Sequence, residues 1–234
     1  MDVSQWGQEF EAPIGEDIGV SYEAFQLTAF FYMAGEDNTK VTLQDGTVKV
    51  LKRGEGAMVR ANQGHKLLSD KPIQVDLLTG DVWSNYEVRW YSLRDNKDYV
   101  SSYVSPVGDS YGKTKLVIYN PLNVTLSYTV QYLLNNVKTS YTKTLAAKQA
   151  AMSIVIPTGS GAFIDGSSKF VALSLTDSEN TNINGVVTGG QYYDWGFPLV
   201  PRGELTPQVV IGLGYACTNN NCQGQTDRSP VWIT

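Results

Sequence analysis

The chain has 234 residues, of which 42% are hydrophobic and 18% charged, and its formal net charge is −5. This composition is typical of a globular protein and argues against bulk disorder. The basic residues are dispersed, which argues against a nucleic-acid partner because such partners require a clustered basic surface. No apolar run approaches the roughly 20 residues that a membrane-spanning helix needs.

Short segments rich in branched and aromatic residues follow one another along the chain, separated by turn residues. Such segments predict strands. Outside two hairpins, we expect strands at 25–33, 57–60, 73–78, 87–93, 115–119, 152–156, 170–175, 184–187, 209–213 and 230–234. No long stretch keeps a helical period, so the sequence predicts an all-β fold.

The two hairpins are marked by their turns. Asp45-Gly46 lies between the strand-like segments 41–44 and 47–51, and this dipeptide is among the strongest short hairpin signals. Asn135-Asn136 follows the segment 124–132, in which every second residue is apolar, and precedes a returning strand. The alternation predicts that one face of 124–132 is buried.

A repeat is visible in the turns. Pro-x-Gly followed by an acidic residue occurs at Pro13, Pro106 and Pro201, with near-equal spacing. In addition, residues 67–79 match residues 164–176 without a gap, each a polar turn leading into an apolar strand that ends in Thr. These landmarks predict a duplication in which the three prolines mark equivalent turns. Convergent turn chemistry is the alternative.

A further landmark, in which Asn38–Val41 parallels Asn123–Leu126, keeps the same order. Many short strands with regular turns are typical of sandwiches and barrels. We therefore expect two tandem, related β-sandwich units of jelly-roll type, packed together or sharing strands. The first would span 1–100, and the second would span 101–234 and include C-terminal closing strands and a cysteine loop.

Cys217 and Cys222 are the two cysteines, with four polar turn-forming residues between them. This spacing suits a small disulfide-closed loop and hence an oxidising compartment. Two free thiols are the second interpretation. A metal site is the third, because the single histidine, His65, is distant in sequence.

The C-terminal part of the chain resembles a known family. Residues 193–201, 205–212 and 229–234 are similar to a block that closes a duplicated β module in large modular, adhesin-like proteins of the cell surface. A weaker likeness is to the N-terminal region of IgGFc-binding-protein-like domains. The two-cysteine loop departs from the Gly-rich acidic loop of the relatives. The resemblance implies an adhesion or surface-coat context and supplies no catalytic residues.

The two ends carry a further expectation. The first residues lack the basic and apolar regions of a signal peptide, and 229–234 ends within a strand-like pattern. We expect both ends to have been cut from a longer protein.

Recognisable catalytic motifs are missing from the sequence. His65 lies in a polar turn, and neither a nucleophile elbow, a P-loop nor a dinucleotide fingerprint is present. Paired carboxylates can hydrolyse glycosides without histidine, but one sequence does not bring two of them together. We therefore expect no enzyme, and a carboxylate-based glycoside hydrolase is the least favoured alternative.

Oxygen-rich turns suggest calcium, which accepts carboxylate and carbonyl ligands. The candidate ligands are Glu16, Asp17, Asp177 and Glu179. Their spacing does not match an EF-hand loop, and ordinary solvated turns are the favoured interpretation. No cofactor is firmly indicated.

Aromatic residues gather at two places in the sequence. The candidate residues for stacking on a sugar are Trp83, Tyr86 and Trp90 in the first cluster and Tyr193 and Trp195 in the second. Exposed rings of this kind stack on sugars. Filling the seam between the two units is the favoured alternative, because the clusters occupy similar places in the repeat.

The function expected from these features is that of a non-catalytic module of a large secreted or surface-anchored protein, acting in adhesion or surface-coat structure. Its partners would be other modules of the same polypeptide and surface glycans or proteins. A carbohydrate-binding module is the alternative.

Overall fold

The computed structural model describes residues 6–19, 23–81, 88–105, 114–157, 159–176 and 195–208, and these form an all-β protein. The strands of the first unit are β1 (Gly7–Glu11), β2 (Leu27–Ala34), β3 (Thr39–Thr42), β4 (Val48–Leu51), β5 (Gly56–Arg60), β6 (Lys66–Gly80) and β7 (Val88–Ser92). Those of the second are β8 (Val100–Ser105), β9 (Lys115–Tyr119), β10 (Leu126–Leu134), β11 (Val137–Leu145), β12 (Ala150–Met152), β13 (Ala162–Thr176), β14 (Trp195–Pro198) and β15 (Val200–Pro201).

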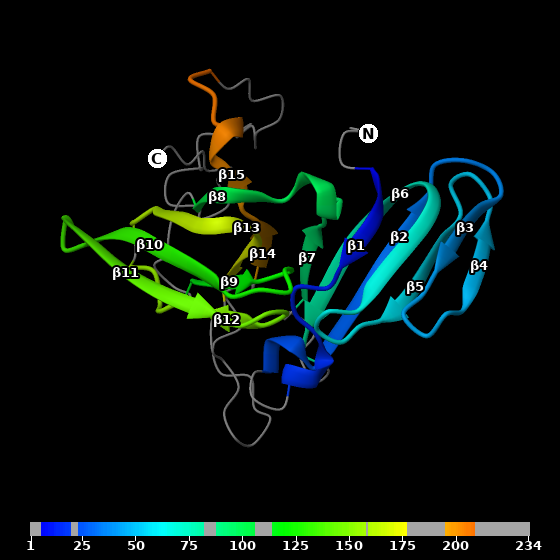
Figure 1. Ribbon diagram of the computed structural model, residues 1–234, viewed down its shortest axis with the longest axis horizontal. Coiled ribbons are helices and arrows are strands. Elements are labelled where there is room, and N and C mark those ends of the chain that lie inside the picture. The colour runs from blue at the N-terminus through cyan, green and yellow to red at the C-terminus, as the bar shows by residue number, and fades with distance from the viewer. Residues whose placement is uncertain are drawn as a thin grey trace, which may run out of the picture.

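Short 3-10 turns are the helical elements of the described chain: η2 (Glu16–Ile18), η3 (Glu23–Phe25), η4 (Asn96–Asp98) and η5 (Arg202–Glu204). None of the helices within the described ranges has the length and apolar character needed to cross a membrane. Figure 1 shows the first unit, in blue through cyan to the bluish green of β7, beside the second, in green to orange. The predicted fold class, two related β-sandwich units, is confirmed.

One long strand organises each unit. The N-terminal half of β6 pairs with β1 and β3, and its C-terminal half pairs with β2 and β7. In the same way β13 pairs first with β8 and β10 and then with β9 and β14. Each 15-residue strand thereby joins the two layers of its sandwich.

The strand registers support the predicted duplication. Phe10 lies opposite Leu67 in the first unit, and Tyr103 lies opposite Ile164 in the second. These are the residues that the ungapped alignment of 67–79 with 164–176 makes equivalent. The β1–β6 and β8–β13 ladders also break at corresponding places, so the match extends to the irregularities.

The expected alignment of Asn38–Val41 with Asn123–Leu126 is wrong. Val41 lies opposite Ser69, and Tyr128 lies opposite Gly166, the residue that the alignment of 67–79 with 164–176 equates with Ser69. Val41 therefore corresponds to Tyr128 and not to Leu126. The expected alignment was two residues short because the β10 strand begins later after its turn.

The third Pro-x-Gly turn is not equivalent to the first. Pro201 ends the two-residue strand β15 and is the residue before η5. β15 and η5 come after β14, as η4 comes after β7. Backbone hydrogen bonds support this correspondence. The Leu93 amide donates to the Val75 carbonyl, and the Leu199 amide donates to the carbonyl of Ala172, the residue that the alignment equates with Val75. Pro201 therefore occupies the place of Asp95. Pro106 lies outside the described residues.

Both predicted hairpins form. Gly46, with a φ of 83°, supplies the positive φ that the β3–β4 turn requires. In the β10–β11 turn Asn135 and Asn136 have φ values of 51° and 63°, and Leu134 pairs with Val137 across it. Two successive positive φ values are the signature of a type I′ turn, which matches the twist of the strands.

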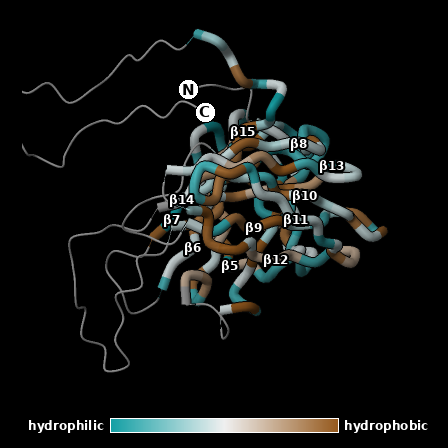
Figure 2. Tube along the Cα trace, turned by 90° about the vertical axis from the view of Figure 1, so that its left-hand side faces the viewer, coloured by the Kyte–Doolittle hydropathy of each residue, from teal (hydrophilic) through white to brown (hydrophobic). Residues whose placement is uncertain are grey.

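The two hydrophobic cores share strands. Val117 and Tyr119 of β9 and Leu173 of β13 belong to the core of the first unit, whereas Leu116 and Ile118 belong to that of the second. Each side of this sheet therefore covers a different core. In Figure 2 the trace near β9 is strongly hydrophobic, as such a middle layer requires. The expected boundary at residue 100 falls at the start of β8, but the first core crosses it.

Polar contacts also join the units. The buried Arg89 of β7 donates from Nε to the Thr176 carbonyl of β13 at 3.0 Å. Gly196 of β14 packs so closely on Tyr91 of β7 that a Cβ there would collide with the tyrosine hydroxyl. Glycine is therefore required at this contact for steric reasons.

Candidate functional site

The outer face of the first sheet exposes apolar side chains. Strands β5, β2, β6 and β7 lie side by side in that order. In β7 the alternation is clear, because Trp90 is 50% exposed whereas its neighbours Arg89 and Tyr91 are fully buried. A strand of this pattern directs Tyr91 into the core and Trp90 toward solvent.

The strand registers assemble the exposed residues into one surface. Met58 lies opposite Phe31, and Phe31 lies opposite Asp76. The rings of Phe31 and Trp90 are in contact, with centroids 4.9 Å apart and an interplanar angle of 53°. We call the surface made by Phe31, Met33, Met58, Gln74, Asp76 and Trp90 the Trp90 face.

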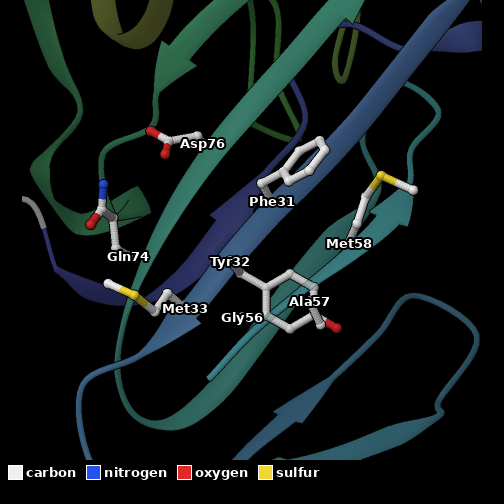
Figure 3. Close-up of a pocket in the computed structure, with 8 residues that line it drawn as sticks. All are labelled: Phe31, Tyr32, Met33, Gly56, Ala57, Met58, Gln74 and Asp76. Atoms are coloured by element: carbon white, nitrogen blue, oxygen red, sulfur yellow. The ribbon is translucent and has the colours of Figure 1, made fainter. Parts of the chain in front are cut away.

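A depression of about 430 Å³ lies on this face, and Figure 3 shows side chains of β2, β5 and β6 around it. Its lining is mainly apolar, with contributions from Phe31, Met33 and Met58. Gly56 also lines it, and the absence of a side chain there leaves room between its neighbours. An open apolar depression with few polar groups is typical of a binding surface.

Two polar side chains complete the depression. Asp76 accepts a hydrogen bond from Ser92 Oγ at 2.6 Å, which fixes its carboxylate. Gln74 lies next to it along the same face of β6 and supplies an amide that can donate and accept. Asp76 is the one carboxylate among the lining residues. The face can therefore stack on an apolar surface and hydrogen-bond a polar group at its edge.

Of the sugar-platform residues expected from the sequence, Trp90 is the one whose side chain is described, and it is exposed. Trp83, Tyr86 and Tyr193 lie outside the described residues. Trp195 pairs through its backbone with Thr176, and its side chain is not described. Sequence reasoning missed Phe31 and Met58, because β2 and β5 carry apolar residues at consecutive positions and their sequences do not mark which face is exposed.

The expected calcium ligands that are described have other partners. Glu16 forms an ion pair with Arg60 Nε and also accepts from the Thr28 amide at 3.2 Å. Asp17 accepts from the Gln63 amide at 2.9 Å. These carboxylates hold turns together. Across the described ranges no three His, Cys, Asp or Glu side chains gather in a way that could hold a metal ion. Asp177, Glu179 and the cysteines Cys217 and Cys222 lie outside those ranges.

A buried polar cluster, which sequence reasoning also missed, lies between the units. Glu11 of β1 has a side chain only 2% exposed, and it accepts hydrogen bonds from Tyr119 Oη and from Lys148 Nζ, the latter at 3.1 and 3.2 Å. Gln63 Nε2 donates to the Lys148 carbonyl at 2.8 Å. We call Glu11, Tyr119 and Lys148 the Glu11 cluster.

The electrostatics of the Glu11 cluster indicate a structural role. Burial and the hydrogen bond to Glu11 raise the pKa of the Tyr119 hydroxyl well above its usual range. That hydroxyl therefore remains a hydrogen-bond donor to the carboxylate at all physiological pH values.

His65, the histidine of the sequence, is half-buried in a turn, where its Nδ1 accepts a hydrogen bond from the Asn62 amide at 3.2 Å.

Comparisons of the chain with protein-family models, with curated proteins and with solved structures found no match.

Proposed function

We propose that this chain is a non-catalytic module of a large secreted or surface-anchored protein, acting in adhesion or surface-coat structure at the cell surface. Its partners are other modules of the same polypeptide and surface glycans or proteins. The observation that carries the proposal is the exposed contact of Phe31 with Trp90 on the Trp90 face. A half-exposed tryptophan beside further exposed apolar side chains is characteristic of interaction surfaces.

The geometry of the Trp90 face supports contact rather than chemistry. Two-carboxylate hydrolysis needs a second acidic group near the first, and the depression contributes Asp76 alone. The hydrogen bond from Ser92 also ties this carboxylate to the sheet. Asp76 is thus suited to accept a hydrogen bond from a ligand.

Carbohydrate binding is the second candidate function, and the combination of groups on the face favours it. The Trp90 and Phe31 rings offer apolar surfaces that can stack on the C–H faces of a sugar. Asp76 and Gln74 stand beside them and can bond the hydroxyl groups at its edge. Stacking combined with a few directed hydrogen bonds is how such sites obtain both affinity and orientation.

A glycan array read with the wild-type chain and with Trp90→Ala tests both candidates. Val50→Ala is the matched control, because Val50 is 58% exposed but lies on β4, away from the Trp90 face. We expect the Trp90 variant to lose binding and the control to keep it. Parallel wells with EDTA show whether binding depends on calcium.

The remaining outcomes separate the two candidates. Wild-type binding to protein-coated surfaces but not to glycans, lost in Trp90→Ala, would support adhesion and reject the sugar. Equal binding by wild type and Trp90→Ala on every surface would reject the Trp90 face as the contact site.

A further inference from the structure

The β10–β11 hairpin carries an exposed apolar tip. Its last pairing with the rest of the sheet is Tyr132 with Ala162, and beyond that point the two arms pair only with each other among the described strands. Leu133, Leu134 and Val137 are 39%, 45% and 64% exposed. Figure 1 shows the hairpin projecting at the left end of the molecule.

The first unit provides an internal reference, because β3–β4 is the equivalent hairpin there. Its strands have four residues each, against nine in β10 and β11. Its turn is polar, with Asp45 bonded to the Thr47 amide at 2.9 Å. A turn of this kind suffices to close the hairpin in this fold. The longer arms and the apolar tip are therefore features that the shared architecture does not require.

The charge of the hairpin is positive. Residues 126–145 contain Lys138 and Lys143 and no Asp or Glu, although the whole chain has a net charge of −5. Lys138 lies opposite Leu133, and Lys143 stands 5.7 Å from the centre of the Tyr141 ring. The nearest acidic residue on the neighbouring strand, Asp165, lies opposite Thr129 and bonds to Ser102 at 2.6 Å.

Apolar side chains occupy both faces of the tip. Leu133 and Leu134 are consecutive strand residues and therefore point to opposite sides, while Leu134 and Val137 share one side across the turn. A groove on a folded protein would cover one side of such a hairpin. A fluid apolar phase surrounds both sides at once.

We propose that the β10–β11 tip docks into an anionic lipid surface. Leu133, Leu134 and Val137 enter the boundary of the acyl chains, and Lys138, one ladder pair behind Leu134 and Val137, contacts the phosphates of the headgroups. Lys143 lies further from the tip and adds to the attraction between the hairpin and the anionic surface. Tyr132 and Tyr141, whose ring centroids are 6.4 Å apart in an edge-to-face contact, pack against the second core behind the tip and support the projecting turn. Because Asn135 and Asn136 form the apex, the insertion is shallow.

Co-sedimentation of the full chain with vesicles tests this docking. The vesicles are phosphatidylcholine alone or mixed with phosphatidylserine, and the variant is Leu134→Ser/Val137→Ser. We expect wild type to bind the mixed vesicles. The variant should bind at least about tenfold more weakly, because two apolar side chains are no longer buried in the lipid. Lys138→Glu/Lys143→Glu should weaken binding to mixed vesicles in particular, because it removes the charge attraction.

The matched control is Val48→Ser/Val50→Ser on the equivalent hairpin, whose side chains are 53% and 58% exposed. We expect it to bind as wild type does. Circular dichroism confirms folding, and Leu133→Ser replaces the double variant if that one is unfolded.

Three results would overturn the proposal: no vesicle binding by wild type, equal binding by the folded tip variant, or equal loss of binding in the control. A tip variant that abolishes self-association in sedimentation velocity without affecting vesicle binding would also overturn it. The tip would then be an interface between copies.

Discussion

Replacing Lys148 by Met should destabilise the protein by leaving the buried Glu11 carboxylate without its main counter-charge. Lys148 Nζ lies 3.1 and 3.2 Å from the two carboxylate oxygens, and Glu11 is 2% exposed. Among the described residues, the nearest other cation is Lys66, whose Nζ lies 4.0 Å from Glu11 Oε2. The variant therefore removes the closest of two charges from an acid that water does not reach.

The magnitude follows from the burial of each partner. Breaking a fully buried ion pair from one side costs about 3–5 kcal/mol. The Lys148 side chain is 38% exposed and Lys66 remains, so we expect about 2–3 kcal/mol in the free energy of unfolding. At this chain length that loss lowers Tm by roughly 4–12 °C.

Urea denaturation and calorimetry of a double-mutant cycle measure this cost. Glu11→Gln/Lys148→Met should lose less stability than the sum of the single variants, because it leaves no buried charge unpaired. Lys138→Met, an exposed lysine on the hairpin, is the control. A loss below about 0.5 kcal/mol for Lys148→Met, or strict additivity in the cycle, would refute the assigned role of the Glu11 cluster.

Asp95→Asn should cost about 1–3 kcal/mol at neutral pH, because the amide nitrogen of Asn cannot accept the Gln8 backbone hydrogen bond that one carboxylate oxygen accepts. Burial raises the pKa of this carboxyl, but backbone hydrogen bonds from Lys97 and Gln8 outweigh it and leave the pKa below its usual value. The stability that ionised Asp95 contributes is present above the unfolded-state pKa, about 3.9, and is lost as the pH falls through the lower folded-state value, so unfolding curves of wild type and variant should converge in strong acid and stay apart at pH 7. Asn136 has a φ of 63°, which asparagine tolerates because its side-chain amide can hydrogen-bond to the local backbone, whereas alanine cannot do so. Asn136→Ala should therefore lower the free energy of unfolding by about 1 kcal/mol in urea denaturation. An unchanged midpoint would contradict the type I′ assignment. Tyr91→Ala should cost about 3–5 kcal/mol because the ring is fully buried, whereas Trp90→Ala should cost less than about 1 kcal/mol; similar losses in thermal unfolding would show that the two residues are not on opposite faces.

Strands and turns with a clear local sequence pattern were predicted correctly. Lys115–Tyr119 has the expected bounds, and the tight turn expected at Asn135-Asn136 forms. Strands β1 and β8 were missed because Gly7–Glu11 and Val100–Ser105 are rich in polar residues. They become strands by pairing with the long strands β6 and β13, which are distant in sequence.

Two errors show where local chemistry was insufficient. Pro201 repeats the Pro13 turn in composition, yet it follows β14 and takes the place of Asp95. The strand expected at 152–156 is β12 at Ala150–Met152, because Ser153 interrupts the ladder by accepting the Leu116 amide on its hydroxyl. In both cases the local sequence pattern was read correctly, but the tertiary surroundings determined the structure that formed.

The candidate sites were accessible to sequence reasoning only in part. Trp90 was identified, but its partner Phe31 lies on β2, and the contact depends on the registers of both strands with β6. Glu11 and Lys148 are 137 residues apart, and no motif links them. Pairings of this kind come from topology, so a single sequence supplies the residues without their neighbours.

The most direct test of the proposed contact surface is the affinity for the strongest ligand found on the array or coated surfaces. The comparison is between Phe31→Ser/Trp90→Ser and the control Val48→Ser/Val50→Ser, which removes two exposed apolar side chains elsewhere. We predict a loss of about tenfold or more for the first and wild-type affinity for the second. Equal affinities for both variants and wild type would contradict the assignment of function to the Trp90 face.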